Sequence, residues 1–417
     1  MHMTRCNNIR AVTWAGAFSK GDFMASKVSR LVAGLAVALF LAKPAEAALL
    51  QAYIGTYTSD HIARSENHGD GIYLVTVDPA TGIPGKPKLA AKTTSPSWIA
   101  LSADRKFLYA VNEYAGFGPQ KSGSVTAYAV DAATGALKLL NTVSSQGAVP
   151  AFVSVHASGK FVMLANYSGG TFAIVRIQPD GSLGEATDVI GPFPAIHPAT
   201  AADNPPGQFA GSDHGGSRAH MIGNDPTGQF VVGDDAGRDE IHVWKLDMAT
   251  GKLADVSRIT ALPGSAPRHF VFSADGKLLY QLFEQDSRLG IYDFNNGKPV
   301  QRGKTVSLLP DGYAGSATGS ELLIARDGKH IYAANRTQDS IAVFALAADG
   351  GVKRIANAAT EADQPRSLTL DPSGQFLYSL NQHGDNVTIF RIDPATGIPH
   401  FTGHYLPVPS PATMVFR

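Results

Sequence analysis

The stretch that decides the fold runs from Gln364 to Gly397 and reads QPRSLTLDPSGQFLYSLNQHGDNVTIFRIDPATG. Ser367–Leu370 and Gln375–Leu380 are apolar runs on either side of a DPSG turn, in which Pro and Gly stand where a type I turn favours them. After a polar loop, Asn386–Ile392 alternates as a third strand with β-branched and aromatic residues. The stretch therefore predicts a small antiparallel sheet joined by tight turns.

The same pattern recurs along the chain. Six copies are recognisable, at 98–130, 152–177, 219–246, 269–294, 321–346 and 367–392. Gln51–Val77 has a second and a third strand without a first, and Ala412–Phe416 resembles a lone first strand. A period of about 50 residues is typical of propellers, whose small sheets bury their faces against one another. We predict an all-β fold, a seven-bladed β-propeller in which the N- and C-terminal strands close one blade and so remove an exposed edge.

Composition excludes several classes of protein. Lys plus Arg equals Asp plus Glu, at 35 each among 417 residues, so no global basic field indicates a nucleic-acid partner. The hydrophobic fraction of 44% is sufficient for a sizeable core. Cys6 is the one cysteine, which excludes disulfides and cysteine-based zinc sites.

The first 47 residues read as an export signal. Met24 is a better start than Met1, and it is followed by Lys27, Arg30 and the short apolar run Leu31–Ala42. An Ala-x-Ala cleavage signal at 45–47 then predicts a mature start near Ala48. We expect an upstream extension plus a signal peptide over 1–47 (the signal at about 24–47) and a single propeller domain over 48–417. The mature protein would be periplasmic or secreted without stable membrane insertion; an uncleaved anchor is the alternative.

Seven polar side chains stand where a propeller opens onto its axis. Groups just before the first strand of a blade, or just after the second, meet over one end of the central channel. These positions hold Arg218, His220, Arg268, His269, Glu284, Arg336 and Arg366. Because Arg forks onto carboxylates and phosphates, the set predicts an anion-binding site with an acid/base pair. The alternative is that the arginines tie the blades together through backbone carbonyls.

Several motifs around these residues resemble one family. APRHFVF at 266–272, followed by Phe283-Glu284, is accompanied in order by VNE at 111–113, ANYSGG at 165–170, ANRT at 334–337 and QPR at 364–366. The set is similar to the lactonase-type seven-bladed propellers, which include propeller-type 6-phosphogluconolactonases and carboxy-cis,cis-muconate cyclase. The likeness covers Ala52 to Arg417 and implies a lactonase, a carboxylic ester hydrolase.

The resemblance also implies which residues act. Carried over position by position, His220, Arg268, Glu284 and Arg336 would be catalytic, and Arg218, His269 and Arg366 would bind substrate. Family members often read Pro-His-Ala-His where this chain reads Ser217-Arg218-Ala219-His220. That difference leaves the substrate open.

The chemistry follows from the residue types. Lactone hydrolysis needs an activated water and a stabilised oxyanion. Glu284 or His220 would take the water proton and the other would protonate the leaving alkoxide, while Arg268 and Arg336 would hold the oxyanion or an anionic substituent.

The expected substrate is a small, sugar-derived, anionic lactone. The resemblance implies 6-phosphogluconolactone, whereas the export signal favours an unphosphorylated aldonolactone. A muconate-type lactonizing or delactonizing enzyme and a non-catalytic ligand- or protein-binding propeller are the alternatives.

No cofactor or metal is predicted. The Asp-x-x-Thr-Gly runs at Asp78, Asp131, Asp247 and Asp393 lack the successive carboxylates of calcium loops and are interpreted as turns. No G-x-S-x-G nucleophile motif is present. One long insertion, Ile190–Gly216, is of the kind that is usually functional or disordered, and its relation to the site is open.

Overall fold

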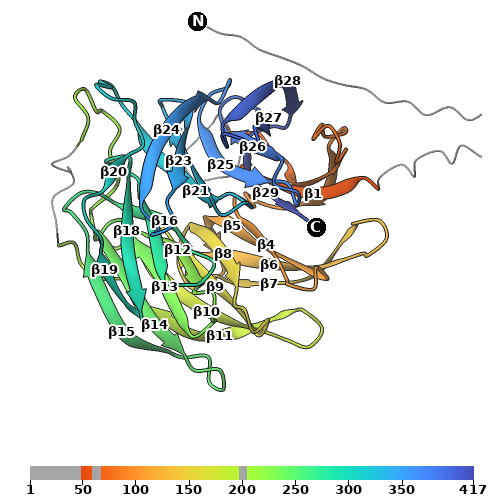
Figure 1. Ribbon diagram of the computed structural model, residues 1–417. Helices are drawn as coiled ribbons and strands as arrows, with labels where there is room; N and C mark the ends of the chain where they lie inside the picture. Colours follow the sequence, from red (N-terminus) through yellow and green to blue (C-terminus); the bar gives the residue numbers. More distant parts are fainter. Residues whose placement is uncertain (1–47, 59–66, 197–203) are drawn as a thin grey trace, which may run out of the picture. The chain divides into compact units, whose positions relative to one another are not determined.

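A computed structural model describes residues 48–58, 67–196 and 204–417. The described residues form seven antiparallel sheets, the blades of a propeller (Figure 1). Blade 1 consists of β29 (Pro411–Phe416), β1 (Leu50–Thr56), β2 (Gly71–Val77) and β3 (Lys88–Lys92). Blade 2 consists of β4 (Ile99–Leu101), β5 (Phe107–Phe117), β6 (Ser122–Val130) and β7 (Leu137–Ser144). Blade 3 consists of β8 (Pro150–Val155), β9 (Phe161–Asn166), β10 (Thr171–Ile177) and β11 (Leu183–Ile190).

The remaining blades follow in chain order. Blade 4 consists of β12 (Ala219–Asn224), β13 (Phe230–Asp235), β14 (Glu240–Leu246) and β15 (Leu253–Thr260). Blade 5 consists of β16 (Pro267–Phe272), β17 (Leu278–Phe283), β18 (Arg288–Asn295), β19 (Lys298–Gln301) and β20 (Val306–Ser307), of which β19 and β20 both pair with β18. Blade 6 consists of β21 (Thr318–Ile324), β22 (His330–Arg336), β23 (Ser340–Leu346) and β24 (Val352–Ala359). Blade 7 consists of β25 (Pro365–Leu370), β26 (Phe376–Asn381), β27 (Asn386–Ile392) and β28 (Pro399–Pro407).

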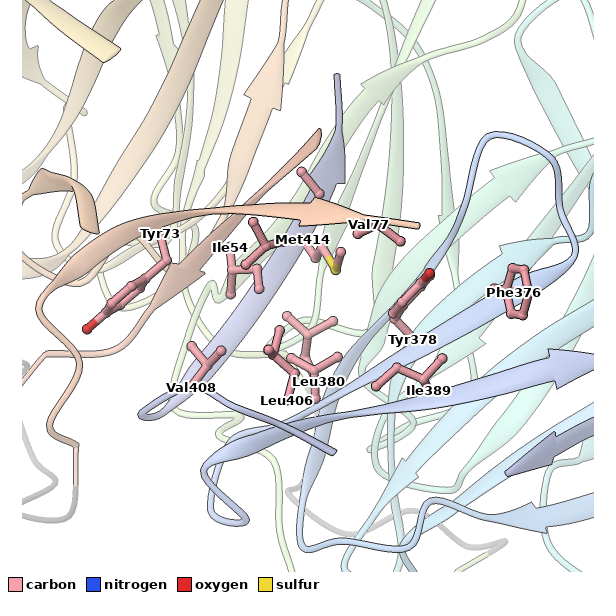
Figure 2. Packing of buried hydrophobic residues seen from close by; sticks show 13 residues of the cluster. Ile54, Tyr73, Val77, Phe376, Tyr378, Leu380, Ile389, Leu406, Val408 and Met414 are labelled. Atoms are coloured by element: carbon pink, nitrogen blue, oxygen red, sulfur yellow. The ribbon is translucent and has the colours of Figure 1, made fainter. Parts of the chain in front are cut away.

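The predicted closure of the ring is confirmed. β29, from the C-terminal end, pairs antiparallel with β1, so the two ends of the domain share blade 1. Seven apolar clusters each join two consecutive blades, and the last one joins blade 7 to blade 1. Figure 2 shows that last cluster, where Met414 of β29 and Ile54 of β1 lie against Tyr378 and Leu380 of β26.

Two details differ from the sequence prediction. Each blade has a fourth, outer strand that the sequence pattern did not predict. These strands are half-exposed and mix polar with apolar residues, as in β7 (LKLLNTVS), so the apolar alternation that marks a strand is weak in them. In the copy at 98–130 the second and third strands are longer than those of the other copies, because β5 extends to Phe117 and β6 begins at Ser122.

A repeated tyrosine joins neighbouring blades. In five blades a tyrosine of the second strand donates its hydroxyl proton to a glycine carbonyl in the turn between the third and fourth strands of the next blade. The pairs are Tyr53–Gly135, Tyr109–Gly181, Tyr280–Gly350, Tyr332–Gly397 and Tyr378–Gly82, at 2.6 to 3.1 Å. We call these residues the inter-blade tyrosines. Three of the turns are Asp-x-x-Thr-Gly runs, in which the Asp carboxylate accepts backbone N–H bonds, as expected for turns.

The signal peptide and the upstream extension, residues 1–47, lie outside the described residues and stay predictions. Within the described ranges there is no helix long and apolar enough to cross a membrane.

Candidate active site

A cavity of about 320 Å³ opens at the end of the blades where the first strand begins and the second ends. Residues from all seven blades and from the insertion line it. They are Tyr57, Asn67, Glu113, Ala151, Tyr167, Ala210, Gly211, His220, Glu284, Thr318, Arg336, Thr337, Gln364, Arg366 and Gln382. Two equivalent positions in each blade supply most of these residues.

The first position lies four residues after the site of the inter-blade tyrosine, at the end of the second strand. In blade order it is occupied by Tyr57, Glu113, Tyr167, Ala236, Glu284, Arg336 and Gln382. All of these except Ala236 line the cavity. One equivalent position of the backbone thus carries five different residue types in the seven blades.

The second position is a β-bulge at the start of the first strand. In six blades the pairing register shifts there and leaves one residue unpaired, namely Ala412, Ala151, His220, Arg268, Ser320 and Arg366. A bulge turns its side chain out of the alternation of the strand, and bulges are frequent beside active sites. Here the bulge points His220 and Arg366 into the cavity.

Residues with a strained backbone, next to the first strand, form hydrogen bonds to the residues of the first position. In five blades a non-glycine residue with positive φ directly precedes the proline at or just before the start of the first strand. These residues are Ser95, Val149, Ala266, Gln364 and Ser410. Each of their carbonyls accepts the N–H of a lining residue, as in Glu284 to Ala266 at 2.7 Å and Tyr167 to Val149 at 2.8 Å. A positive φ is costly for a β-branched residue such as Val149. The strained residues therefore anchor the backbone of the cavity wall.

Glu284 lies between two arginines. Arg268 Nε is 2.9 Å from its Oε2, and Arg336 Nη2 is 3.0 Å from its Oε1. Burial alone would raise the pKa of Glu284, but the charges of Arg336, Arg268 and Arg366 outweigh it and lower the pKa to about 2. The carboxylate is ionised at neutral pH and accepts protons poorly.

His220 is buried among aromatic rings. Its ring meets the edges of Tyr167 at 5.8 Å and His269 at 5.2 Å, and its Nδ1 has no hydrogen-bond partner among the described residues. Burial lowers the pKa of His220 well below its usual value, and the nearby charge of Arg268 lowers it further. The imidazole is therefore neutral at pH 7 and can accept a proton.

The insertion forms part of the site. Ala210 and Gly211 line the cavity, and Ser212 Oγ lies 3.4 Å from Glu284 Oε1. Buried His214 fastens this segment, since its Nε2 is 3.3 Å from Asp239 Oδ1. Asp239 also accepts the backbone N–H groups of Gly264 and Ala266. The segment 204–216 thus adds a wall to the cavity.

Three predicted residues, Arg218, Arg268 and His269, do not line the cavity. Arg218 lies two residues before its bulge, where its guanidinium pairs with Asp213 at 2.8 Å. His269 follows its bulge and is buried beneath the site, with Nδ1 2.9 Å from Glu321 Oε1 and Nε2 accepting from Arg268. Arg268 is itself only 1% exposed and reaches the site through Glu284. His220, Glu284, Arg336 and Arg366 are brought together directly.

Among the lining residues that were not predicted, four occupy the first equivalent position: Tyr57, Glu113, Tyr167 and Gln382. The signal was present in the repeats, because all four occupy the same position as Glu284 and Arg336 relative to the second strand. Among the described residues, no group of three or more His, Cys, Asp and Glu side chains could hold a metal ion.

Residues 51–416 match the family model described as "Lactonase, 7-bladed beta-propeller". The chain belongs to this lactonase family. The resemblance seen in the motifs is thereby confirmed, together with the expectation of a lactonase-class enzyme.

The match to three relatives covers nearly their whole length. The 6-phosphogluconolactonase of Bacillus subtilis (strain 168) is 29% identical over 366 residues, which covers 87% of this chain and 97% of the relative. A 6-phosphogluconolactonase of Formosa agariphila is 28% identical over 83% of this chain and 93% of its own. The solved structure of the Pseudomonas aeruginosa periplasmic gluconolactonase PpgL is 28% identical, with a TM-score of 0.77 over 88% of this chain and 99% of that one.

Proposed function

We propose that this protein hydrolyses an unphosphorylated, sugar-derived lactone to the corresponding aldonic acid outside the cytoplasm. One observation carries the proposal: neutral His220 and ionised Glu284 face one cavity together with the guanidinium groups of Arg336 and Arg366. A proton acceptor beside fixed positive charge suits water attack on a carbonyl, where an oxyanion develops.

His220 is the base in this proposal. Because His220 is neutral and Glu284 is ionised at neutral pH, neither begins the reaction as an acid. His220 takes a proton from water while the water oxygen bonds to the lactone carbonyl. The resulting imidazolium is a strong acid among the arginines, and it gives its proton to the ring oxygen as the carbonyl–oxygen bond breaks. Glu284 orients the water and Arg336.

Charge pairing favours an uncharged lactone. Among the described residues, three arginines gather at the site, Arg268, Arg336 and Arg366, and three carboxylates lie near them, Glu113, Glu284 and Glu321. A phosphate dianion needs surplus positive charge, which the charges of these described residues do not offer. During hydrolysis of an uncharged lactone, the oxyanion and the His220 imidazolium form together, so the net charge of the site does not change. The alternative substrate is an anionic lactone, as expected from the family resemblance.

Location supports the same choice. The relative from Pseudomonas aeruginosa is named a periplasmic gluconolactonase, and the N-terminus of this chain reads as a signal peptide. We therefore propose export to the periplasm or beyond, where phosphorylated sugar intermediates are scarce.

The test is lactone hydrolysis by the protein comprising residues 48–417. Glucono-1,5-lactone and its 6-phosphate are compared by acid release at constant pH, with spontaneous hydrolysis subtracted. We expect turnover with the higher kcat/KM for the unphosphorylated lactone. A preference for the phosphate would overturn the substrate assignment, and no acceleration of either lactone would overturn the activity.

A further inference from the structure

Arg366 differs from the other two arginines of the site in how its guanidinium is used. Arg268 pairs with Glu284 through Nε and donates to His269 through Nη1. Arg336 uses Nη2 for Glu284 and for the Gly319 carbonyl. Arg366 donates through Nε to Tyr57, and no hydrogen bond or ion pair to a described residue engages its two terminal nitrogens. Its guanidinium fork remains available to the cavity that it lines.

A chain of hydrogen bonds fixes that fork. Arg366 Nε donates to Tyr57 Oη at 3.0 Å, and Tyr57 Oη donates to Glu113 Oε2 at 3.0 Å. The hydroxyl of Ser97 donates to the same Glu113 oxygen. Arg366 also packs over the Tyr57 ring, with Cζ 5.7 Å from the ring centroid. Tyr57, Glu113 and Ser97 are buried, so the chain is a rigid support.

The chain crosses the seam of the propeller. Arg366 belongs to blade 7, Tyr57 follows β1 of blade 1, and Glu113 lies in β5 of blade 2. Blade 1 is the one that the two ends of the domain complete together. The orientation of an arginine near the end of the chain is therefore set by residues near its beginning.

From this arrangement the structure assigns Tyr57 and Glu113 as positioning residues that hold the guanidinium fork of Arg366 for the carboxylate formed when the lactone opens. This assignment rests on the proposed function. An arginine fork matches a carboxylate with two parallel hydrogen bonds, and fixing the fork in advance lowers the entropic cost of binding. Tyr57 is well suited to this task, since its hydroxyl accepts from Arg366 and donates to Glu113 at once.

Tyr57→Phe removes the hydroxyl and keeps the ring. We expect KM for glucono-1,5-lactone to rise, and the affinity for D-gluconate measured by calorimetry to fall, by about tenfold, with kcat within about threefold of wild type. Tyr53→Phe is the matched control, because this buried tyrosine of β1 bonds to Gly135 and lies away from the cavity. It should leave KM and gluconate affinity unchanged.

A double-mutant cycle separates positioning from direct contact, because Tyr57 itself lines the cavity. Arg366→Lys keeps the charge but loses the fork and the Nε donor. If Tyr57 acts through Arg366, Tyr57→Phe adds less than about twofold to the loss of gluconate affinity in Arg366→Lys. Additive losses, or unchanged gluconate affinity in Tyr57→Phe, would overturn the assignment.

The two proposals fail separately. Absence of lactone turnover by the wild type removes the proposed function, whereas the gluconate titration still tests the role of Arg366. Turnover that is normal in the wild type and equally normal in Tyr57→Phe and Arg366→Lys removes only the positioning assignment. Absence of gluconate binding by the wild type would also overturn it.

Discussion

Arg268 and Glu284 form a buried ion pair, with Nε of the arginine 2.9 Å from Oε2 of the carboxylate. Arg268 is 1% exposed and comes from the bulge of blade 5, while Glu284 follows the second strand of the same blade. The bulge places the two side chains face to face. A second arginine, Arg336 of blade 6, then shares the carboxylate. Glu284 therefore joins two blades as well as lining the cavity.

Replacing Glu284 by Gln should impair activity and stability together. The variant leaves Arg268 buried without its counter-charge, and breaking such a pair costs about 3 kcal/mol. We expect kcat/KM for lactone hydrolysis to fall by about a hundredfold or more. Urea titration and the lactone assay measure the two effects.

Asp275→Asn is the control for that variant. Asp275 also pairs with a cation in blade 5, Lys277, but the pair is exposed. Asp275→Asn should change neither the free energy of unfolding nor kcat/KM measurably. A Glu284→Gln enzyme with the wild-type rate would refute the role of this carboxylate.

The pH dependence of the rate tests His220. A base must be unprotonated to act, and the pKa of His220 is lowered by burial and by the nearby arginines. The acid limb of kcat/KM should therefore lie well below pH 6.5, and the rate should be flat between about pH 6 and 7.5. A limb at or above pH 6.5 would show that another group is the base. His220→Gln should lose the rate without losing the fold, as circular dichroism would show.

Buried Asp234 should make the fold less stable at higher pH. Burial raises its pKa from 3.8 to about 8, and Oδ1 has no hydrogen-bond partner among the described residues. The folded protein therefore holds a proton that the unfolded chain releases above about pH 4. The contribution of protonated Asp234 to the free energy of unfolding is complete below that pH. It falls by about 1.4 kcal/mol per pH unit up to about pH 8.

Asp234→Asn removes this dependence and retains an oxygen for Gln281 Nε2, which lies 2.9 Å from the carboxylate. The free energy of unfolding should fall less steeply from pH 5 to 8 in the variant than in wild type. Exposed Asp247→Asn serves as the control and should keep the wild-type slope over this range. Parallel pH profiles for wild type and Asp234→Asn would contradict the raised pKa.

The inter-blade tyrosine at the seam should contribute measurably to stability. Tyr378 Oη donates to the Gly82 carbonyl at 2.8 Å and thereby joins blade 7 to blade 1. Tyr378→Phe should cost about 1 kcal/mol in the free energy of unfolding, measured with urea. Tyr405→Phe is a suitable comparison, because that hydroxyl bonds to Glu361 at 3.3 Å on the surface. Equal stability of the two variants would count against the inter-blade role.

The repeats and the site differ in how far they could be predicted. Strand alternation and Gly-containing turns recur in every blade, so the seven blades and the shared blade 1 were predicted correctly. The outer strands were missed because their half-exposed residues mix polar with apolar side chains and carry a weak pattern. Glu284 and Arg336 were found from their position after the second strand, but Tyr57, Glu113 and Tyr167 were passed over at that same position.

The sequence by itself determined the architecture, because short-range periodicity and turn residues specify each blade, and seven blades with complementary apolar faces close into a ring. Only the tertiary structure decided which polar residues face the cavity. A one-residue bulge points His220 and Arg366 inward, whereas Arg218 and His269, one or two positions away, point elsewhere. The support of Arg366 by Tyr57, 309 residues apart in the chain, likewise exists only because the ring closes. Alternation along a strand is a local property, but a shift in register depends on the partner strand.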